Sequence, residues 1–229
     1  MSILENYLSV RERFEDACKC AGRDPSELTL IAVTKFIDIP RIAEALPGGV
    51  TDVGENRVQD LKDKLNFFEM NGLRTHLIGQ LQTNKVKYIC NQVSMIQSVD
   101  RPGLLNKLEQ QSAKNGGIQD ILIQVNIGDE PQKGGVAVDD LPGLFESAVS
   151  MEHLNVRGLM CVPPAVEGEL VRPYFARMFK LYTDLAAAYP GRQIDTLSMG
   201  MSHDYELAIA EGANMVRVGT AIFGTRVHP

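Results

Sequence analysis

The chain has 229 residues, 44% hydrophobic and 23% charged, which is typical of a globular protein with a large core. Its formal net charge of −6, without a basic stretch, argues against general nucleic-acid binding. No apolar run approaches the roughly 18 residues of a membrane span, and the first residues lack the basic and apolar parts of a signal peptide. We therefore expect a cytoplasmic protein that binds neither nucleic acid nor membranes.

The segment 2–21 predicts an amphipathic helix, because Ile3, Tyr7, Val10 and Phe14 recur on one face. After it, strand-like and helix-like segments alternate along the chain. The candidate strands are 28–35, 51–55, 74–79, 94–99, 120–127, 154–161, 193–199 and 214–219. The candidate helices between them are 39–46, 57–70, 83–91, 102–115, 138–151, 169–188 and 204–212.

Eight strands separated by seven helices, without a long linker, predict an α/β fold. We expect one (β/α)8 barrel of the TIM type over residues 1–229, with an extra N-terminal helix. A doubly wound open sheet is the alternative, but such sheets usually carry a GxGxxG turn after the first strand. Here the first strand is followed by residues 35–38, which contain no glycine.

The cysteines and histidines are too scattered to indicate a disulfide framework or a metal site. Cys18 and Cys20 are too close in sequence for an ordinary disulfide, Cys90 and Cys161 are isolated, and no CxxC pair occurs. The histidines show no metal-ligand spacing. We therefore expect reduced thiols and no metal.

Lys35 is unusual because it ends the apolar first strand, 28–35. Burial disfavours the charged form of a lysine and lowers its pKa. A neutral lysine at the end of a strand is a nucleophile that can form a Schiff base with an aldehyde. The alternative is that the strand has ended and that Lys35 extends into water.

The segments 198–202 and 217–220 follow the seventh and eighth strands, where barrels of this type commonly bind phosphate. Glycines let the backbone approach a ligand, and the hydroxyls of Ser202 and Thr220 add donors. The alternative is that Ser202 only caps a helix and that Gly219 only forms a turn. Arg217 shares a strand face with Gly219 and needs a partner inside a barrel. That partner is either a buried carboxylate or the ring nitrogen of a ligand whose phosphate lies at Gly219 and Thr220.

A Schiff-base lysine, a phosphate site and an arginine for a ring nitrogen together describe a pyridoxal phosphate site. Here the chain resembles the single-domain pyridoxal-phosphate-binding proteins of vitamin B6 homeostasis, a family similar to the N-terminal domain of alanine racemase. The segments that carry the resemblance are 31–35, 54–56 with 58–59, 76–85, 124–126 through 133–134, 158–160, 197–202 with 204, and 217–224. They extend from the first strand to the last and keep the family's order.

The resemblance implies a set of residues that bind pyridoxal 5′-phosphate. They are Lys35, Asn56, His76, Ser202, Arg217, Gly219 and Thr220. Lys35 would carry the Schiff base, Arg217 would face the pyridine nitrogen, and Asn56 and His76 would lie near the ring. The three remaining residues would bind the phosphate.

The resemblance leaves the roles of one arginine and one lysine open. Arg57 stands where the family often has tyrosine, which alters the mouth of the site. Lys133 is a second lysine near the predicted rim, and we interpret it as a solvated loop residue.

Arginine cannot take a proton from the ring nitrogen, so the ring is a weak electron sink. A two-base racemase needs a second acid or base, which full-length racemases take from a further C-terminal domain, whereas few residues follow Gly224 here. The resemblance implies a monomeric homeostasis protein that holds pyridoxal phosphate, serves apo-enzymes that depend on it, and has at most weak racemase-like activity. The alternatives are a true amino-acid racemase and a cofactor-free Schiff-base aldolase acting on a phosphorylated sugar.

Overall fold

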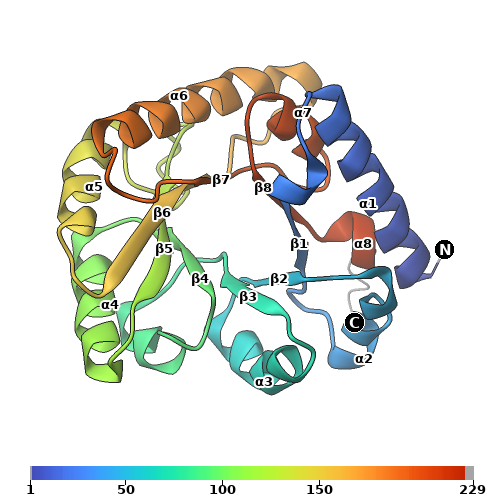
Figure 1. Ribbon diagram of the computed structural model, residues 1–229, viewed down its shortest axis with the longest axis horizontal. Helices are drawn as coiled ribbons and strands as arrows, with labels where there is room; N and C mark the ends of the chain where they lie inside the picture. Colours follow the sequence, from blue (N-terminus) through green and yellow to red (C-terminus); the bar gives the residue numbers. More distant parts are fainter. Residues whose placement is uncertain (1, 225–229) are drawn as a thin grey trace.

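A computed structural model describes residues 2–224 and places their strands in one closed parallel barrel (Figure 1). The strands are β1 (Thr29–Val33), β2 (Asp52–Glu55), β3 (Arg74–Leu77), β4 (Met95–Val99), β5 (Gln119–Val125), β6 (Leu154–Cys161), β7 (Thr196–Ser198) and β8 (Met215–Val218). Each strand pairs with the next in chain order, and β1 pairs with β8 to close the barrel. The predicted barrel is confirmed, and the open sheet is excluded.

Helices surround the barrel, as the alternating sequence pattern predicts. They are α1 (Ile3–Cys20), α2 (Ile39–Ala43), α3 (Val58–Met70), α4 (Pro102–Asn115), α5 (Leu141–Val149), α6 (Arg172–Ala188), α7 (Tyr205–Ala210) and α8 (Thr220–Phe223). The expected helix at 83–91 is instead a 3-10 helix, η3 (Thr83–Tyr88), with i to i+3 hydrogen bonds such as Lys85 N to Gln82 O. Shorter 3-10 turns are η1 (Pro25–Glu27), η2 (Leu46–Gly48), η4 (Val138–Asp140) and η5 (Gly168–Val171).

The predicted N-terminal helix is α1, and it packs beside α7 and α8 (Figure 1). Ser2 caps it: the Ser2 hydroxyl accepts from the Glu5 amide at 3.2 Å, and the Glu5 carboxylate accepts from the Ser2 amide at 2.7 Å. The face carrying Tyr7 and Phe14 is buried, as the periodicity predicts. Burial of each such side chain contributes about 1.5–3 kcal/mol.

The main core lies between the sheet and the helices, and a smaller apolar cluster fills part of the barrel interior. The members of that inner cluster are Ile31, Val33, Met95, Leu122, Met160 and Met215. Polar side chains, among them His76, Gln97 and Arg217, occupy other interior positions. An interior that is not fully apolar indicates a function there, because buried polar groups are costly unless hydrogen-bonded.

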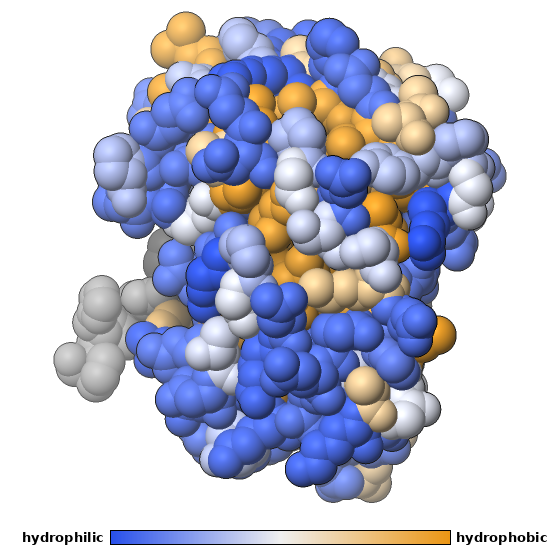
Figure 2. Space-filling view, turned by 90° about the vertical axis from the view of Figure 1, so that its left-hand side faces the viewer, coloured by the Kyte–Doolittle hydropathy of each residue, from blue (hydrophilic) through white to orange (hydrophobic). Residues whose placement is uncertain are grey.

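Figure 2 shows mostly hydrophilic side chains on the face formed by α4 and α5, with apolar side chains visible in a hollow across its middle. Within residues 2–224, no helix combines the length and the apolar character needed to span a bilayer.

Candidate functional site

A cavity of about 300 Å³ lies at the carboxyl ends of the strands. Its lining residues are Val33, Lys35, Asn56, Ile78, Val162, Met201, Ser202, His203, Arg217, Gly219 and Thr220. All of the predicted site residues except His76 are among them. The sequence interpretation missed Val33, Ile78, Val162, Met201 and His203, although most of them directly follow or end a strand and could have been found by that position.

Lys35 lies in a turn and not at the end of a strand. β1 ends at Val33, and the amide of Ile37 donates to the Thr34 carbonyl at 3.0 Å to close the turn. Phe36 occupies this turn with a φ of 61°, a conformation that is uncommon for a residue with a Cβ atom. The prediction that the strand reaches Lys35 was therefore wrong by two residues, and the exposed Lys35 side chain lines the cavity from the turn.

A buried ion pair fixes the residue before the turn that carries Lys35. The ammonium of Lys64, on α3, lies 2.5 Å from the Glu55 carboxylate at the end of β2 and donates to the Thr34 carbonyl at 2.9 Å. The Thr34 hydroxyl donates to the same Glu55 oxygen at 2.8 Å. Glu55 is fully buried and Lys64 is 7% exposed. The residue that precedes Lys35 is thus fixed by two elements that lie far from it in the sequence.

The loops after β7 and β8 are joined through Ser202. Its hydroxyl accepts from the amides of Gly219 and Ala221 at 3.2 and 3.4 Å. Ser202 does not cap α7, because α7 begins only at Tyr205 with Asp204 before it. The alternative of a plain helix cap is therefore excluded, and the hydroxyl links the two loops that were expected to bind phosphate.

Glycines make these two loops possible. Gly200 has a φ of 92°, and a Cβ atom there would lie 2.6 Å from the Cβ of Ala208. A Cβ atom on Gly219 would lie 3.2 Å from the Cβ of Val33, so the chain after β8 passes close to β1. A larger residue at Gly200 would strain the backbone, and one at Gly219 would press against the Val33 side chain.

Arg217 is 4% exposed and lies within the barrel, at the cavity wall. Its guanidinium donates to the Ser198 hydroxyl at 2.5 Å and to the Cys161 carbonyl at 2.7 Å. Among the described residues, no carboxylate forms an ion pair with it, so the alternative of a buried carboxylate partner is excluded. Burial lowers the pKa of Arg217.

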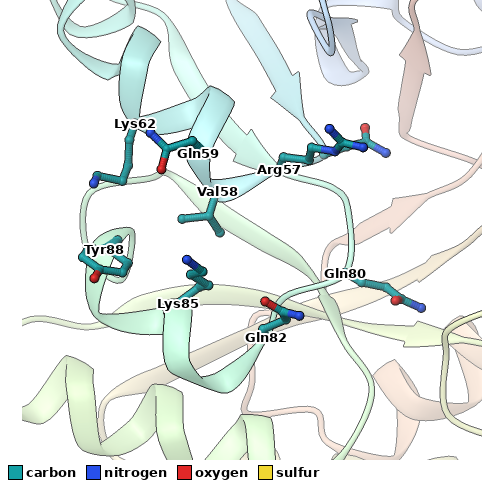
Figure 3. Close-up of a pocket in the computed structure, with 9 residues that line it drawn as sticks. Arg57, Val58, Gln59, Lys62, Gln80, Gln82, Lys85 and Tyr88 are labelled. Carbon is teal, nitrogen blue, oxygen red and sulfur yellow. The ribbon is translucent and has the colours of Figure 1, made fainter.

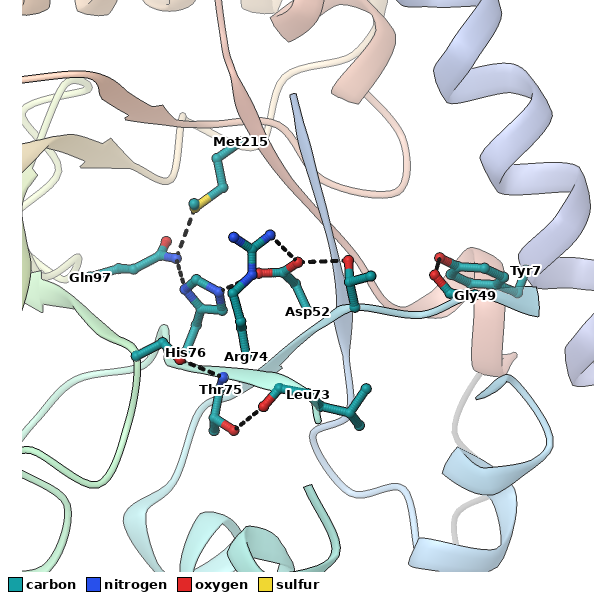
Figure 4. Close-up of polar contacts among 11 residues, drawn as sticks. Tyr7, Gly49, Asp52, Leu73, Arg74, Thr75, His76, Gln97 and Met215 are labelled. Carbon is teal, nitrogen blue, oxygen red and sulfur yellow. Dashed lines mark hydrogen bonds and ion pairs between the residues drawn. The ribbon is translucent and has the colours of Figure 1, made fainter. Parts of the chain in front are cut away.

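A chain of buried hydrogen bonds connects Arg217 to the opposite end of the barrel. The Ser198 hydroxyl, which accepts from Arg217, donates to the Gln97 carboxamide oxygen at 2.7 Å. The Gln97 amide nitrogen lies 3.2 Å from His76 Nδ1, and His76 Nε2 lies 2.8 Å from an Asp52 carboxylate oxygen (Figure 4). His76 is therefore linked to the cavity only indirectly, through this chain.

Asp52, at the far end of this series of hydrogen bonds, carries a stable negative charge. Burial raises the pKa of Asp52, but hydrogen bonds from His76 and Arg74 outweigh it, and the net pKa is lowered. Arg74 donates to the second carboxylate oxygen at 2.8 Å, and the Thr51 hydroxyl donates to the same oxygen at 2.8 Å. Both carboxylate oxygens are thus satisfied.

Three further residues near the rim have distinct environments. The side-chain oxygen of Asn56 is buried and accepts no hydrogen bond from any described residue, and Asn56 lines the cavity. Lys133 forms an ion pair with Glu130 at 2.5 Å and donates to the Pro163 carbonyl, after β6, at 2.8 Å, so it is half-buried and joins two loops, and its interpretation as a solvated loop residue was wrong. The Arg57 guanidinium lies 4.9 Å from the centre of the Phe36 ring, over the turn that carries Lys35.

Comparisons with known proteins agree with this geometry. The family model "Alanine racemase, N-terminal domain" matches residues 9–227. The pyridoxal phosphate homeostasis protein of Aquifex aeolicus is 42% identical over the full length of both chains. The chain belongs to the pyridoxal phosphate homeostasis protein family. The Escherichia coli K12 member is 39% identical, and the match covers 98% of this chain and 97% of that protein.

Several solved structures share the fold of this chain. PipY of Synechococcus elongatus, with pyridoxal phosphate bound, matches with a TM-score of 0.81 and 31% identity over 93% of this chain and 100% of that chain. A structure described as an unknown protein from Bifidobacterium adolescentis matches with a TM-score of 0.89 and 32% identity over 96% of this chain and 94% of that chain. Alanine racemase of Streptomyces coelicolor shares the fold, with a TM-score of 0.73 at 16% identity, and this chain covers 59% of it.

Proposed function

We propose that the protein binds pyridoxal 5′-phosphate in the cavity at the barrel mouth and acts in the homeostasis of that cofactor. The observation that carries the proposal is that one cavity of about 300 Å³ holds the Lys35 amine, the Arg217 guanidinium and the hydroxyls of Ser202 and Thr220. PipY, which shares this fold at 31% identity, has been solved with pyridoxal phosphate bound.

The groups in the cavity fit the chemistry of this cofactor. An amine matches its aldehyde, and a guanidinium, which only donates, matches a ring nitrogen that accepts. The amide of Thr220, at the start of α8, donates to no described residue, and with the neighbouring hydroxyls it matches a phosphate. The buried oxygen of Asn56 is a further unsatisfied group at the cavity wall.

When bound, the cofactor supplies an aldehyde carbon that reacts reversibly with amines and a ring that withdraws electrons. Lys35 holds that carbon as a Schiff base and releases it when another amine competes. Arg217 donates to the ring nitrogen and cannot protonate it, so electron withdrawal is weak. These residues are suited to holding and releasing the cofactor and are poorly suited to turning over amino acids.

We further propose that the protein works in the cytoplasm as a monomer and supplies the cofactor to apo-enzymes. The four cysteines of the chain are free in the structure, which suits a reducing compartment. The release step tests this part: cofactor passed from the holoprotein to an apo-enzyme, measured by the activity gained, supports it.

Lys35 is the first residue to test. Borohydride reduction of the holoprotein, followed by peptide mapping, should place the cofactor on Lys35. Lys35→Ala should lose the covalent linkage and the visible absorbance while the far-UV circular dichroism stays unchanged, because the side chain is exposed. Lys133→Ala is the matched control and should keep the linkage. Labelling of another lysine, with Lys35 unmodified, contradicts the assignment, and a colourless protein favours the aldolase alternative.

One observation favours the racemase alternative: His203 lines the same cavity and is a second group that can carry a proton. Incubation of the holoprotein with single enantiomers of amino acids separates the two functions. We expect only slow inversion and α-proton exchange. Turnover at about 1–10³ s⁻¹, the ordinary enzymatic range, that is lost in His203→Ala would establish a racemase instead.

A further inference from the structure

A second pocket lies beside the cofactor cavity, where the chain leaves β2 and β3 (Figure 3). Its volume is about 450 Å³, within the range of small-molecule sites. The residues that line it are Asn56, Arg57, Val58, Gln59, Lys62, Gln80, Gln82, Lys85 and Tyr88. Asn56 also lines the cofactor cavity, so the two pockets are neighbours.

The side chains that line this pocket include positive charges and no negative charge. Arg57, Lys62 and Lys85 line it, and no aspartate or glutamate does. Within residues 2–224 none of the three forms an ion pair, although the chain as a whole carries a net charge of −6. The lining residue Gln59 donates from its amide to the Asp63 carboxylate at 3.1 Å, and Asp63 itself does not line the pocket. A positive cluster without its own carboxylates attracts anions.

The cationic groups gather around one aromatic ring. The ammonium groups of Lys62 and Lys85 lie 4.5 and 5.8 Å from the centre of the Tyr88 ring, and that of Lys87 lies at 4.8 Å. Figure 3 shows Lys62 from α3 and Lys85 from η3 near Tyr88, with Val58 beside them. Val58 is buried and forms an apolar floor, so the pocket offers charge at its walls and an apolar surface below.

The N-terminus of α3 adds to this positive field. α3 has 13 residues and begins at Val58, in the pocket lining, and Arg57 before it provides no side-chain cap. The first amides of an uncapped helix are free to donate, and the helix dipole favours negative charge at that end. Cationic side chains and free helix amides are the two features that recur in phosphate sites.

We propose that this pocket binds a small polyanion of the phosphate class, at a site distinct from the one that holds the cofactor. Lys62, Lys85 and the first amides of α3 are the groups that contact it. The site goes beyond the proposed function, because none of these groups is needed to bind pyridoxal phosphate. An occupant would lie beside Asn56 and thus next to the bound cofactor.

The test is a calorimetric titration of the holoprotein with pyrophosphate at constant ionic strength, with the visible absorbance recorded in parallel. In the holoprotein the cofactor's own phosphate site is already occupied. Pyrophosphate should bind to the wild type without loss of the cofactor absorbance. Lys62→Gln/Lys85→Gln should weaken that binding at least about tenfold, since hydrogen bonds between charged groups are lost.

The matched control is Lys107→Gln/Lys114→Gln, which removes the same charge from two exposed lysines of α4 outside the pocket. This control should bind pyrophosphate as the wild type does. Equal weakening in both double variants would show an effect of net charge alone and would overturn the proposal. So would an absence of binding, or binding that displaces the cofactor absorbance.

The two proposals fail separately. If the protein takes up no pyridoxal phosphate, the same titration is carried out on the protein as purified, with Ser202→Ala as a second control. Weakening in Lys62→Gln/Lys85→Gln but not in Ser202→Ala then supports the second site while the proposed cofactor function fails. Weakening in Ser202→Ala alone places the anion in the cofactor cavity and overturns the second site.

Discussion

Arg217 is a buried cation without a directly paired carboxylate among the described residues, and a series of hydrogen bonds connects it to Asp52. The Gln97 amide nitrogen lies 3.2 Å from His76 Nδ1 and 3.1 Å from the Met215 sulfur, so it donates to both and its oxygen is left to accept from Ser198. His76 Nδ1 therefore accepts, and His76 Nε2 carries the proton that is donated to Asp52. All of the donors in this series of hydrogen bonds point from Arg217 toward Asp52. Hydrogen bonds that are aligned in this way strengthen one another.

This alignment predicts that Ser198 positions the Arg217 guanidinium. Ser198→Ala should shift the visible spectrum of the bound cofactor and lower its affinity by about tenfold, while the linkage to Lys35 remains, because a hydrogen bond to a charged group is lost. Ser198→Thr keeps the hydroxyl and should restore both the spectrum and the affinity. The measurement is a titration with pyridoxal phosphate followed by absorbance. If Ser198→Ala has the wild-type spectrum and affinity, the Cys161 carbonyl alone is sufficient to orient Arg217.

At the scale of the elements, the sequence predicts the barrel well because buried parallel strands are short apolar runs and the helices between them are amphipathic. Their order also predicts which segments meet at the carboxyl ends, which is why the sequence brings Lys35, Ser202 and Thr220 together, and these three residues line one cavity. The end of β1 was misplaced because the turn at Thr34 is fixed by Glu55 and Lys64, contacts for which the local sequence carries no signal. In the sequence, Lys64 is only one of several charged residues on an amphipathic helix.

The buried pair of Lys64 and Glu55 should stabilise the junction of β1, β2 and α3. Lys64→Met leaves the buried Glu55 charge without its partner, and the free energy of unfolding should fall by about 3–5 kcal/mol. Lys62→Met, on the exposed side of the same helix, loses only the contact of the ammonium with the Tyr88 ring and should change this free energy by no more than about 1 kcal/mol. Denaturation in urea measures both. Glu55→Leu/Lys64→Met should recover most of the loss, and a double variant as unstable as Lys64→Met would show that Lys64 acts through the Thr34 carbonyl alone.

At the scale of the whole molecule, the dependence of stability on pH should include a contribution from Asp52. Its pKa in the folded state lies below the value of 3.8 that it has in the unfolded chain. Its contribution is therefore complete above that unfolded value and is lost as the pH falls toward the folded one. Asp52→Asn should destabilise the protein at about pH 6 by more than at about pH 3, measured by urea denaturation at both. A constant difference between the two proteins would show that the Asp52 charge is not what stabilises the chain of hydrogen bonds.

The rates at which a reagent labels the cysteines show whether the barrel unfolds as a whole or opens locally. Burial raises the pKa of Cys161 to about 12 and that of Cys90 to about 11, and Cys18 is also buried with a raised pKa, whereas Cys20 is exposed. Because the thiolate is the reactive form, a thiol reagent should label only Cys20 in the native protein and all four cysteines after denaturation. Mass spectrometry counts the labels over time. Bound pyridoxal phosphate should slow the labelling of Cys161 further, because a ligand that binds only the folded barrel lowers the population that opens. Labelling of Cys161 as fast as that of Cys20 would mean that the strands around Arg217 separate without unfolding of the rest, which would leave Arg217 without the fixed position that its proposed role in the cofactor site requires.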